Sequence, residues 1–314
     1  MLLNGNSFGF VASSSVNSYT KNMPESDNHL SSQKKKTFTG LARRLGRLPA
    51  EKKKVSLEMS AALAAVSLKV SREFVEAVPK AAKILSADDL RDWAEMGRKV
   101  AMANADLGVD YFAKGVNSLR KIPAKSRSMI FQICTRQLIL SSSIALETFE
   151  LIPRLTKEVD DKKLLTDILK LASEIANRSA KHSADFLQKT PEVSKSFEKF
   201  GRSKTKVAKA TLNLASHFAS RTGGMTADLW SSLPEVLESL KAKNAVLLMK
   251  SATEFLEYGG SVTLHFVTSG AKTLAGFDAV FAEWRELLKE FAKHGNAVLI
   301  SLLRVSPQFF KLIG

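Results

Sequence analysis

A landmark residue, either proline or glycine, recurs along this chain at a nearly constant spacing. The successive spacings are 36, 38, 38, 43, 36 and 37 residues. The landmarks are Pro79, Gly115, Pro153, Pro191, Pro234, Gly270 and Pro307. Four positions before them stand large apolar or aromatic residues: Val75, Tyr111, Phe149, Leu187, Trp230, Phe266 and Leu303. A fixed period near 38 is typical of one supersecondary unit that is stacked many times.

The pattern inside each unit predicts two helices. From about residue 50 onward, apolar residues recur three or four positions apart, which is typical of amphipathic helices. Small or turn-forming residues precede most landmarks by about eleven or twelve positions: Ser141–Ser143, Ser179-Ala180, Thr222-Gly223-Gly224, Tyr258-Gly259-Gly260 and Gly295-Asn296. Glycine can adopt positive φ and end a helix there. We therefore expect a helix of about 15 residues, a turn, and a helix of about 10 that the landmark breaks.

The expected fold is all-α, an α-solenoid of about seven helix-turn-helix units over residues 49–314. Its units are expected to end near residues 84, 122, 159, 200, 241, 277 and 314. The positions 22, 19, 15 and 4 residues before each landmark should face inward. At the first of these positions stand Leu57, Trp93, Phe131, Leu169, Leu212 and Leu248, with Arg285 as the exception. Trp93, Trp230 and Trp284 are interpreted as packing residues.

Residues 1–54 hold ten basic and three acidic residues, so they carry +7 of the formal net charge of +16. Residues 1–48 are rich in Ser, Asn and Lys, and we expect a basic, disordered tail. Leu41, Leu45 and Leu48 recur at helical spacing with arginines between them. The candidate electrostatic contacts are Lys34, Lys35, Lys36, Arg43, Arg44, Arg47, Lys52, Lys53 and Lys54. Two interpretations remain open: a solubilising tail, or an anchor for lipid or nucleic acid.

The sequence carries no motif for catalysis or for binding a metal or cofactor. Cys134 is the single cysteine, so no intrachain disulfide can form, and we expect a small buried core residue. None of the five histidines has metal-ligand spacing, and phosphate loops and nucleophile elbows are absent. We therefore expect a protein that is not an enzyme, without metal or cofactor. No uninterrupted apolar run is long enough to span a membrane, and no secretory signal stands out. Both observations favour the cytoplasm.

The last residues form a candidate exposed interface. Phe309, Phe310, Leu312 and Ile313 follow the last landmark, where a repeat array usually has a polar cap. Three alternatives remain open. These residues pack back on the last unit, they bind a partner or a second copy of the chain, or the natural polypeptide continues beyond them.

Leu90-Arg-Asp-Trp93-Ala-Glu-Met-Gly97, with Ala103 and Tyr111-Phe112 after it, carries a family resemblance. A similar pattern runs from Asp278 through Trp284 to Ser306-Pro307. It resembles the helical repeats that precede von Willebrand type A domains in bacterial proteins of the NorD/CoxE group. The resemblance implies a scaffold role beside an AAA-type ATPase. The Asp-x-Ser-x-Ser motif of the type A domain is missing, so its metal-dependent adhesion does not carry over.

These observations favour a cytoplasmic scaffold for protein interactions. A basic surface would attract an acidic protein partner. The first alternative is a basic solenoid that binds RNA, which would need one exposed residue type recurring in every unit. No such column is apparent in the sequence. The second alternative is a peripheral protein that binds anionic lipid. Arg43, Arg44 and Arg47 would make the first contact with the lipid surface.

Overall fold

The computed structural model describes residues 43–159, 161–222 and 224–313. The chain divides into two compact units, Met1–Leu48 and Pro49–Gly314. Among the described residues there are helices and no strand, so the all-α prediction is confirmed. The predicted tail lies almost wholly outside the described residues, except for 43–48.

Helices of two alternating sets make up the second unit. The even-numbered helices are α2 (Ala50–Ala64), α4 (Ala87–Ala103), α6 (Ala124–Gln137), α8 (Lys162–Ala176), α10 (Lys204–Thr222), α12 (Ala242–Phe255) and α14 (Phe281–Ala292). The odd-numbered helices are α3 (Leu68–Ala81), α5 (Ala105–Lys121), α7 (Ser142–Glu158), α9 (Ala180–Glu198), α11 (Met225–Glu238), α13 (Gly260–Gly276) and α15 (Asn296–Ile313). Short 3-10 turns are η1 (Gly201–Ser203), η2 (Leu256–Tyr258) and η3 (Asp278–Val280).

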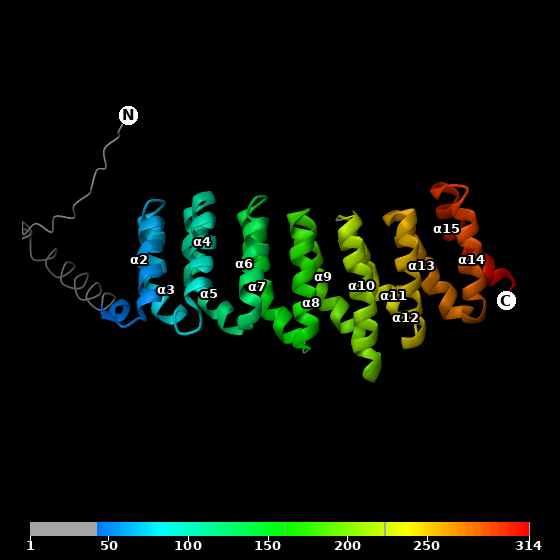
Figure 1. Cartoon of the computed structure of the whole chain (residues 1–314), viewed down its shortest axis with the longest axis horizontal. Coiled ribbons are helices and arrows are strands. Elements are labelled where there is room, and N and C mark those ends of the chain that lie inside the picture. Colours follow the sequence, from blue (N-terminus) through cyan, green and yellow to red (C-terminus); the bar gives the residue numbers. More distant parts are fainter. Residues whose placement is uncertain (1–42, 160, 223, 314) are drawn as a thin grey trace, which may run out of the picture. The chain divides into compact units, whose positions relative to one another are not determined.

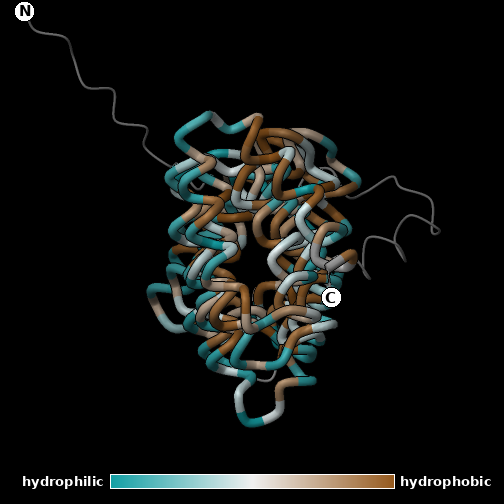
Figure 2. The backbone as a smooth tube through the Cα atoms, turned by 90° about the vertical axis from the view of Figure 1, so that its right-hand side faces the viewer, coloured by the Kyte–Doolittle hydropathy of each residue, from teal (hydrophilic) through white to brown (hydrophobic). Residues whose placement is uncertain are grey.

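Each helix packs against a neighbour in sequence, and all helices but α14 also pack closely against a helix of their own set. The odd-numbered helices contact one another in order from α3 to α15, and the even-numbered helices do so from α2 to α12. Figure 1 shows the resulting row of upright helices, from blue α2 to red α15. Figure 2 shows two layers from the side, with hydrophilic segments most common along the outer edge of the left-hand layer.

The predicted turns lie between the helices of a pair. Gly259 and Gly295 have φ of 105° and 102°, a conformation that residues with a Cβ rarely adopt. Ser179 caps α9, because its hydroxyl accepts a hydrogen bond from the His182 N–H at 3.3 Å. Gly224 differs from the prediction, since its φ of −62° is helical. Gly223 lies outside the described residues.

The landmark residues do not break the chain, and this part of the prediction is wrong. All of them lie inside odd-numbered helices, which are 14 to 19 residues long and not ten. A proline removes one backbone donor, and packing on both sides of the helix outweighs that loss. A Cβ on Gly270 would come within 2.7 Å of the Leu248 side chain in α12. Such a landmark marks a close approach between the helices of a pair.

The inward register holds in most of the chain and fails in the first pair. Trp93, Phe131 and Leu169 are buried as predicted, and so are Trp230 and Trp284. Leu57, however, is 55% exposed. Val75 is only half-buried, whereas its neighbour Phe74 is fully buried. The first pair is therefore displaced by one residue, because Val78 and not Pro79 occupies the landmark position.

We expect Gly97→Ala to lower the free energy of unfolding by about 1–3 kcal/mol, because overpacking a core forces side chains and backbone apart. Gly97 lies in α4, and a Cβ there would overlap the ring of Phe112 in α5. Urea unfolding followed by circular dichroism measures the change. Gly276→Ala is the matched control, since no atom lies within 4 Å of a Cβ at Gly276. Equal stability of the two variants would contradict the close approach of α4 and α5.

Candidate interaction surface

An apolar groove opens between the last two helices, and we call it the α14–α15 groove. Its volume is about 400 Å³. It is lined by Val280, Glu283, Trp284, Leu287, Phe291, Leu302, Val305, Ser306 and Phe309. Glu283 is the one charged lining residue, and its carboxylate has no ion pair or hydrogen bond within the described part of the chain.

Two helical stripes create this groove. Along η3 and α14 the apolar residues Val280, Trp284, Leu287 and Phe291 are spaced 4, 3 and 4 apart, so they share one face. Along α15 a stripe of the same spacing contains Val298, Leu302, Val305, Phe309 and Leu312. Buried Leu299 and Leu303 lie beside this stripe, because α15 also packs on α13. The helix is thus apolar over more of its circumference than one neighbour can cover.

The floor of the groove is fixed by aromatic packing. The Trp284 ring stacks on Phe266 of α13 with centroids 5.4 Å apart and planes at 15°. Phe281 lies beside both rings, at 5.6 Å from Trp284 and 6.2 Å from Phe266. Such contacts contribute beyond the area they bury. The groove is therefore built on a packed core.

The predicted C-terminal interface residues contribute to this surface. Phe309 lines the groove and is 59% exposed, and Leu312 is 85% exposed. The side chains of Phe310 and Ile313 lie outside the described residues. Sequence reasoning missed Val280 and Leu287, although their 3–4 spacing with Trp284 was readable. The structure brings them together with Phe309.

The predicted cationic contacts have different surroundings. Lys34, Lys35 and Lys36 lie outside the described residues. Arg43, Arg44 and Arg47 are exposed, as is Lys53. Lys54 lies 3.9 Å from Glu58 in an exposed ion pair of small energetic value. Lys52 donates to the Ala82 carbonyl at 2.8 Å, so its charge caps the C-terminal end of α3.

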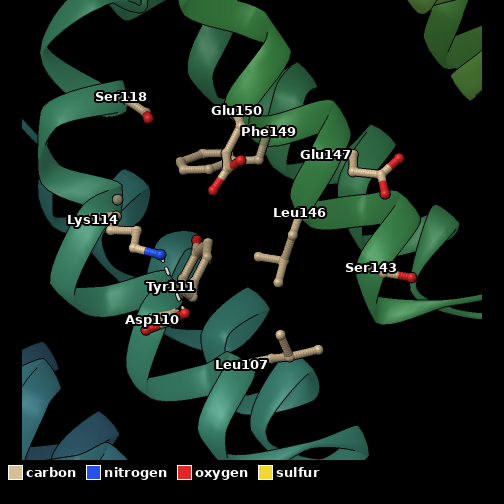
Figure 3. Close-up of a pocket in the computed structure, with 11 residues that line it drawn as sticks. Leu107, Asp110, Tyr111, Lys114, Ser118, Ser143, Leu146, Glu147, Phe149 and Glu150 are labelled. Atoms are coloured by element: carbon tan, nitrogen blue, oxygen red, sulfur yellow. Dashed lines mark hydrogen bonds and ion pairs between the residues drawn. The ribbon is translucent and has the colours of Figure 1, made fainter.

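A smaller cleft, lined by both charged and apolar residues, lies between α5 and α7 (Figure 3). Its volume is about 190 Å³. Asp110 and Lys114 form an ion pair of 3.2 Å on one side. Glu150 extends toward them from α7, and Glu147, which also lines the cleft, points away from them (Figure 3). Tyr111 donates its hydroxyl to the Trp93 carbonyl at 3.1 Å, and burial raises the pKa of this phenol. The tyrosine is thus a packing residue beneath an acidic surface.

Two acidic residues of this cleft, Asp110 and Glu147, belong to a row that sequence reasoning missed. Carboxylates recur at one of two adjacent register positions on five successive odd-numbered helices: Glu73, Asp110, Glu147, Asp185 and Asp228. None of them is buried. We call these five residues the acidic row. The register position of the carboxylate changes by one residue between α5 and α7. The row therefore does not appear when the units are compared at a single register position.

The described residues contain no cluster of His, Cys, Asp and Glu that could hold a metal ion. Cys134 is fully buried, as predicted, and burial raises the pKa of its thiol. None of the described helices is long and apolar enough to cross a membrane. Comparisons with family models, with curated proteins and with solved structures find no match for this chain.

We expect Lys52→Ala to destabilise the fold by about 1 kcal/mol, because the carbonyl at the end of α3 loses a charged donor. The exposed Lys53→Ala makes the same change of charge and should stay within about 0.5 kcal/mol of the parent protein. Thermal and urea unfolding at one ionic strength measure both. Equal losses for the two variants would mean that net charge, and not the Lys52 hydrogen bond, matters.

Proposed function

We propose that this chain is a non-enzymatic scaffold for protein interactions, built as an α-solenoid of seven helix pairs with a period near 38 residues. The order of contacts between helices of the same set supports the solenoid, because each pair touches chiefly its neighbours. The resemblance to the repeats preceding type A domains is consistent with the same role. We also place the protein in the cytoplasm.

The α14–α15 groove is the observation that carries the proposal. Six of the twelve large apolar side chains exposed among the described residues fall within 280–312. Concentrated apolar exposure of this kind marks interaction sites, whereas single exposed residues need no explanation. The two facing stripes have the spacing that an amphipathic helix presents, so the groove suits helix-in-groove recognition.

A protein partner is favoured over nucleic acid by the acidic row. Phosphate groups would be repelled by carboxylates that recur on α3, α5, α7, α9 and α11. Several cations are also engaged within the fold. Arg136 donates to the Ser173 carbonyl at 3.1 Å, and Lys199 donates to the Leu237 carbonyl at 2.7 Å. The net charge therefore overstates the positive surface that remains for a polyanion.

Site-specific photo-cross-linking in cells tests this function. A benzoylphenylalanine replaces Phe309 at the groove, and a control chain carries it at Leu68, which is 78% exposed in α3. We expect one defined cross-linked protein from position 309 and none from position 68. Adding Leu287→Glu should reduce that product at least fivefold, because a carboxylate then occupies the apolar groove. The mass of the product tells a second copy from a different protein.

The absence of any defined product from position 309 would overturn the proposed role of the groove. An unchanged product in the Leu287→Glu background would do the same.

A further inference from the structure

We propose that the edge of the second unit along which successive helix pairs are joined docks on the surface of an anionic phospholipid membrane. The docking part consists of the connections α5–α6, α7–α8 and α9–α10, each with the adjoining turn of both helices. These are residues 118–127, 155–165 and 195–207, and we call them the cationic edge. The α14–α15 groove is not part of it, so this inference goes beyond the proposed function and does not rest on it.

The excess positive charge of the second unit is concentrated on this edge. Residues 49–314 contain 40 basic and 29 acidic residues, a net charge of +11. The 34 residues of the cationic edge contain twelve basic and four acidic ones, so they supply +8 of that charge. Figure 1 shows the three connections in succession along the lower side of the row of helices. A surface dominated by one sign of charge attracts a partner of the opposite sign.

Most of these cations remain available to a partner. Three of the twelve are engaged in hydrogen bonds or ion pairs within the fold: Arg127, Lys199 and Lys204. The other nine side chains are exposed, and none has a hydrogen bond or ion pair within the described part of the chain. Two of the acidic side chains are engaged, since Glu158 pairs with Arg154 at 2.8 Å and Asp161 caps α8. The free side chains of the edge are therefore mainly positive.

The stability of the helices does not explain these cations. The helix dipole favours acidic residues in the first turn of a helix and basic residues in the last. Four lysines nevertheless lie in the first turns of α6, α8 and α10: Lys125, Lys162, Lys163 and Lys206. None of these three turns contains an acidic residue. Arrangements that disfavour the local structure are expected where a surface has a function.

A lipid surface fits this edge better than a single-stranded nucleic acid. Proteins that bind single strands combine positive charge with exposed aromatic rings on which the bases stack. The described residues of the cationic edge expose no such ring. Phe197 is buried, and the half-buried ring of Phe200 has Lys199 Nζ 5.1 Å from its centroid. Clusters of lysine and arginine without aromatic residues are the pattern that attracts anionic headgroups.

The acidic row gives a second reason and sets the orientation on the membrane. Asp110, Glu147 and Asp185 lie 11 to 13 residues before the ends of α5, α7 and α9 at the cationic edge. At a rise of 1.5 Å per residue, they stand about 16–20 Å from those ends. Charges separated by more than about 8 Å are largely screened at physiological salt. A flat membrane at the helix ends is therefore hardly repelled by the row, whereas a nucleic acid along the helix bodies would be.

Flotation of the purified full chain with lipid vesicles tests this inference. The vesicles consist of phosphatidylcholine alone, or of phosphatidylcholine with about 30% phosphatidylserine as the anionic lipid. We expect binding to the second kind only, and weaker binding as salt rises. An edge variant combines Lys121→Glu, Lys125→Glu and Lys206→Glu. It should bind at least tenfold more weakly, because each cation near an anionic surface strengthens binding about fivefold.

Two variants with the same change of charge are the controls. The turn variant combines Arg178→Glu, Lys181→Glu and Arg221→Glu, which are exposed residues at the turns within pairs. It should bind within about threefold of the parent chain, because these positions lie at the far ends of the helices, beyond the screening length. The first-unit variant combines substitutions to glutamate at the three basic residues of 43–47. Circular dichroism melting checks folding, and Lys121→Ala with Lys125→Ala replaces the edge variant if the reversals unfold it.

A parent chain that does not bind the phosphatidylserine vesicles would overturn the inference. Binding of a random-sequence DNA duplex in their place, lost in the edge variant, would assign the edge to nucleic acid instead. Equal losses in the edge and turn variants would also overturn it, because net charge alone would then matter. So would unchanged binding of the edge variant, with or without a loss in the first-unit variant. The scaffold function is tested separately, by the cross-link at position 309.

Discussion

The apolar face of each helix pair can be buried only by the pair beside it, and the fold depends on this constraint. Aromatic contacts across successive pairs show how it is met. Tyr111 of α5 lies 5.3 Å from Phe149 of α7, and Phe186 of α9 lies 4.6 Å from Trp230 of α11. In the solenoid proposed above, stability is shared between neighbouring pairs. A single overpacked contact, such as one at Gly97, acts first on its own pair and the adjacent one.

Long basic side chains join helices of the same pair or of neighbouring pairs through their polar ends. Lys52, Arg136 and Lys199 each donate to a backbone carbonyl near the C-terminal end of a helix 30 or more residues further along the chain. Carbonyls at helix ends lack partners within the helix, and the helix dipole favours positive charge there. Part of the positive charge is therefore structural. The acidic row, in contrast, remains on the surface of the odd-numbered helices.

The same constraint explains the α14–α15 groove. An inner pair hides its apolar faces on both sides, whereas α15 has an apolar outer stripe and no odd-numbered helix beyond it in the described chain. Exposed apolar area of this kind is unfavourable in water, so a protein partner gains free energy by covering it. The packed contact of Trp284 with Phe266 fixes the floor of the groove. A groove with a fixed floor loses little conformational entropy on binding, which favours association.

Sequence alone determined the helical class, the turns at Gly259 and Gly295, and the inward positions at Trp93 and Leu169, because these follow from local periodicity and backbone freedom. It also named Phe309 and Leu312 as candidates for an exposed interface. Tertiary structure decided that helices continue through the landmark prolines, since packing outweighs one lost hydrogen bond. It decided as well that Leu57 faces solvent and that Leu287 joins Phe309. Periodicity shows which residues share a face, but only the packed neighbours determine which faces meet and which remain open.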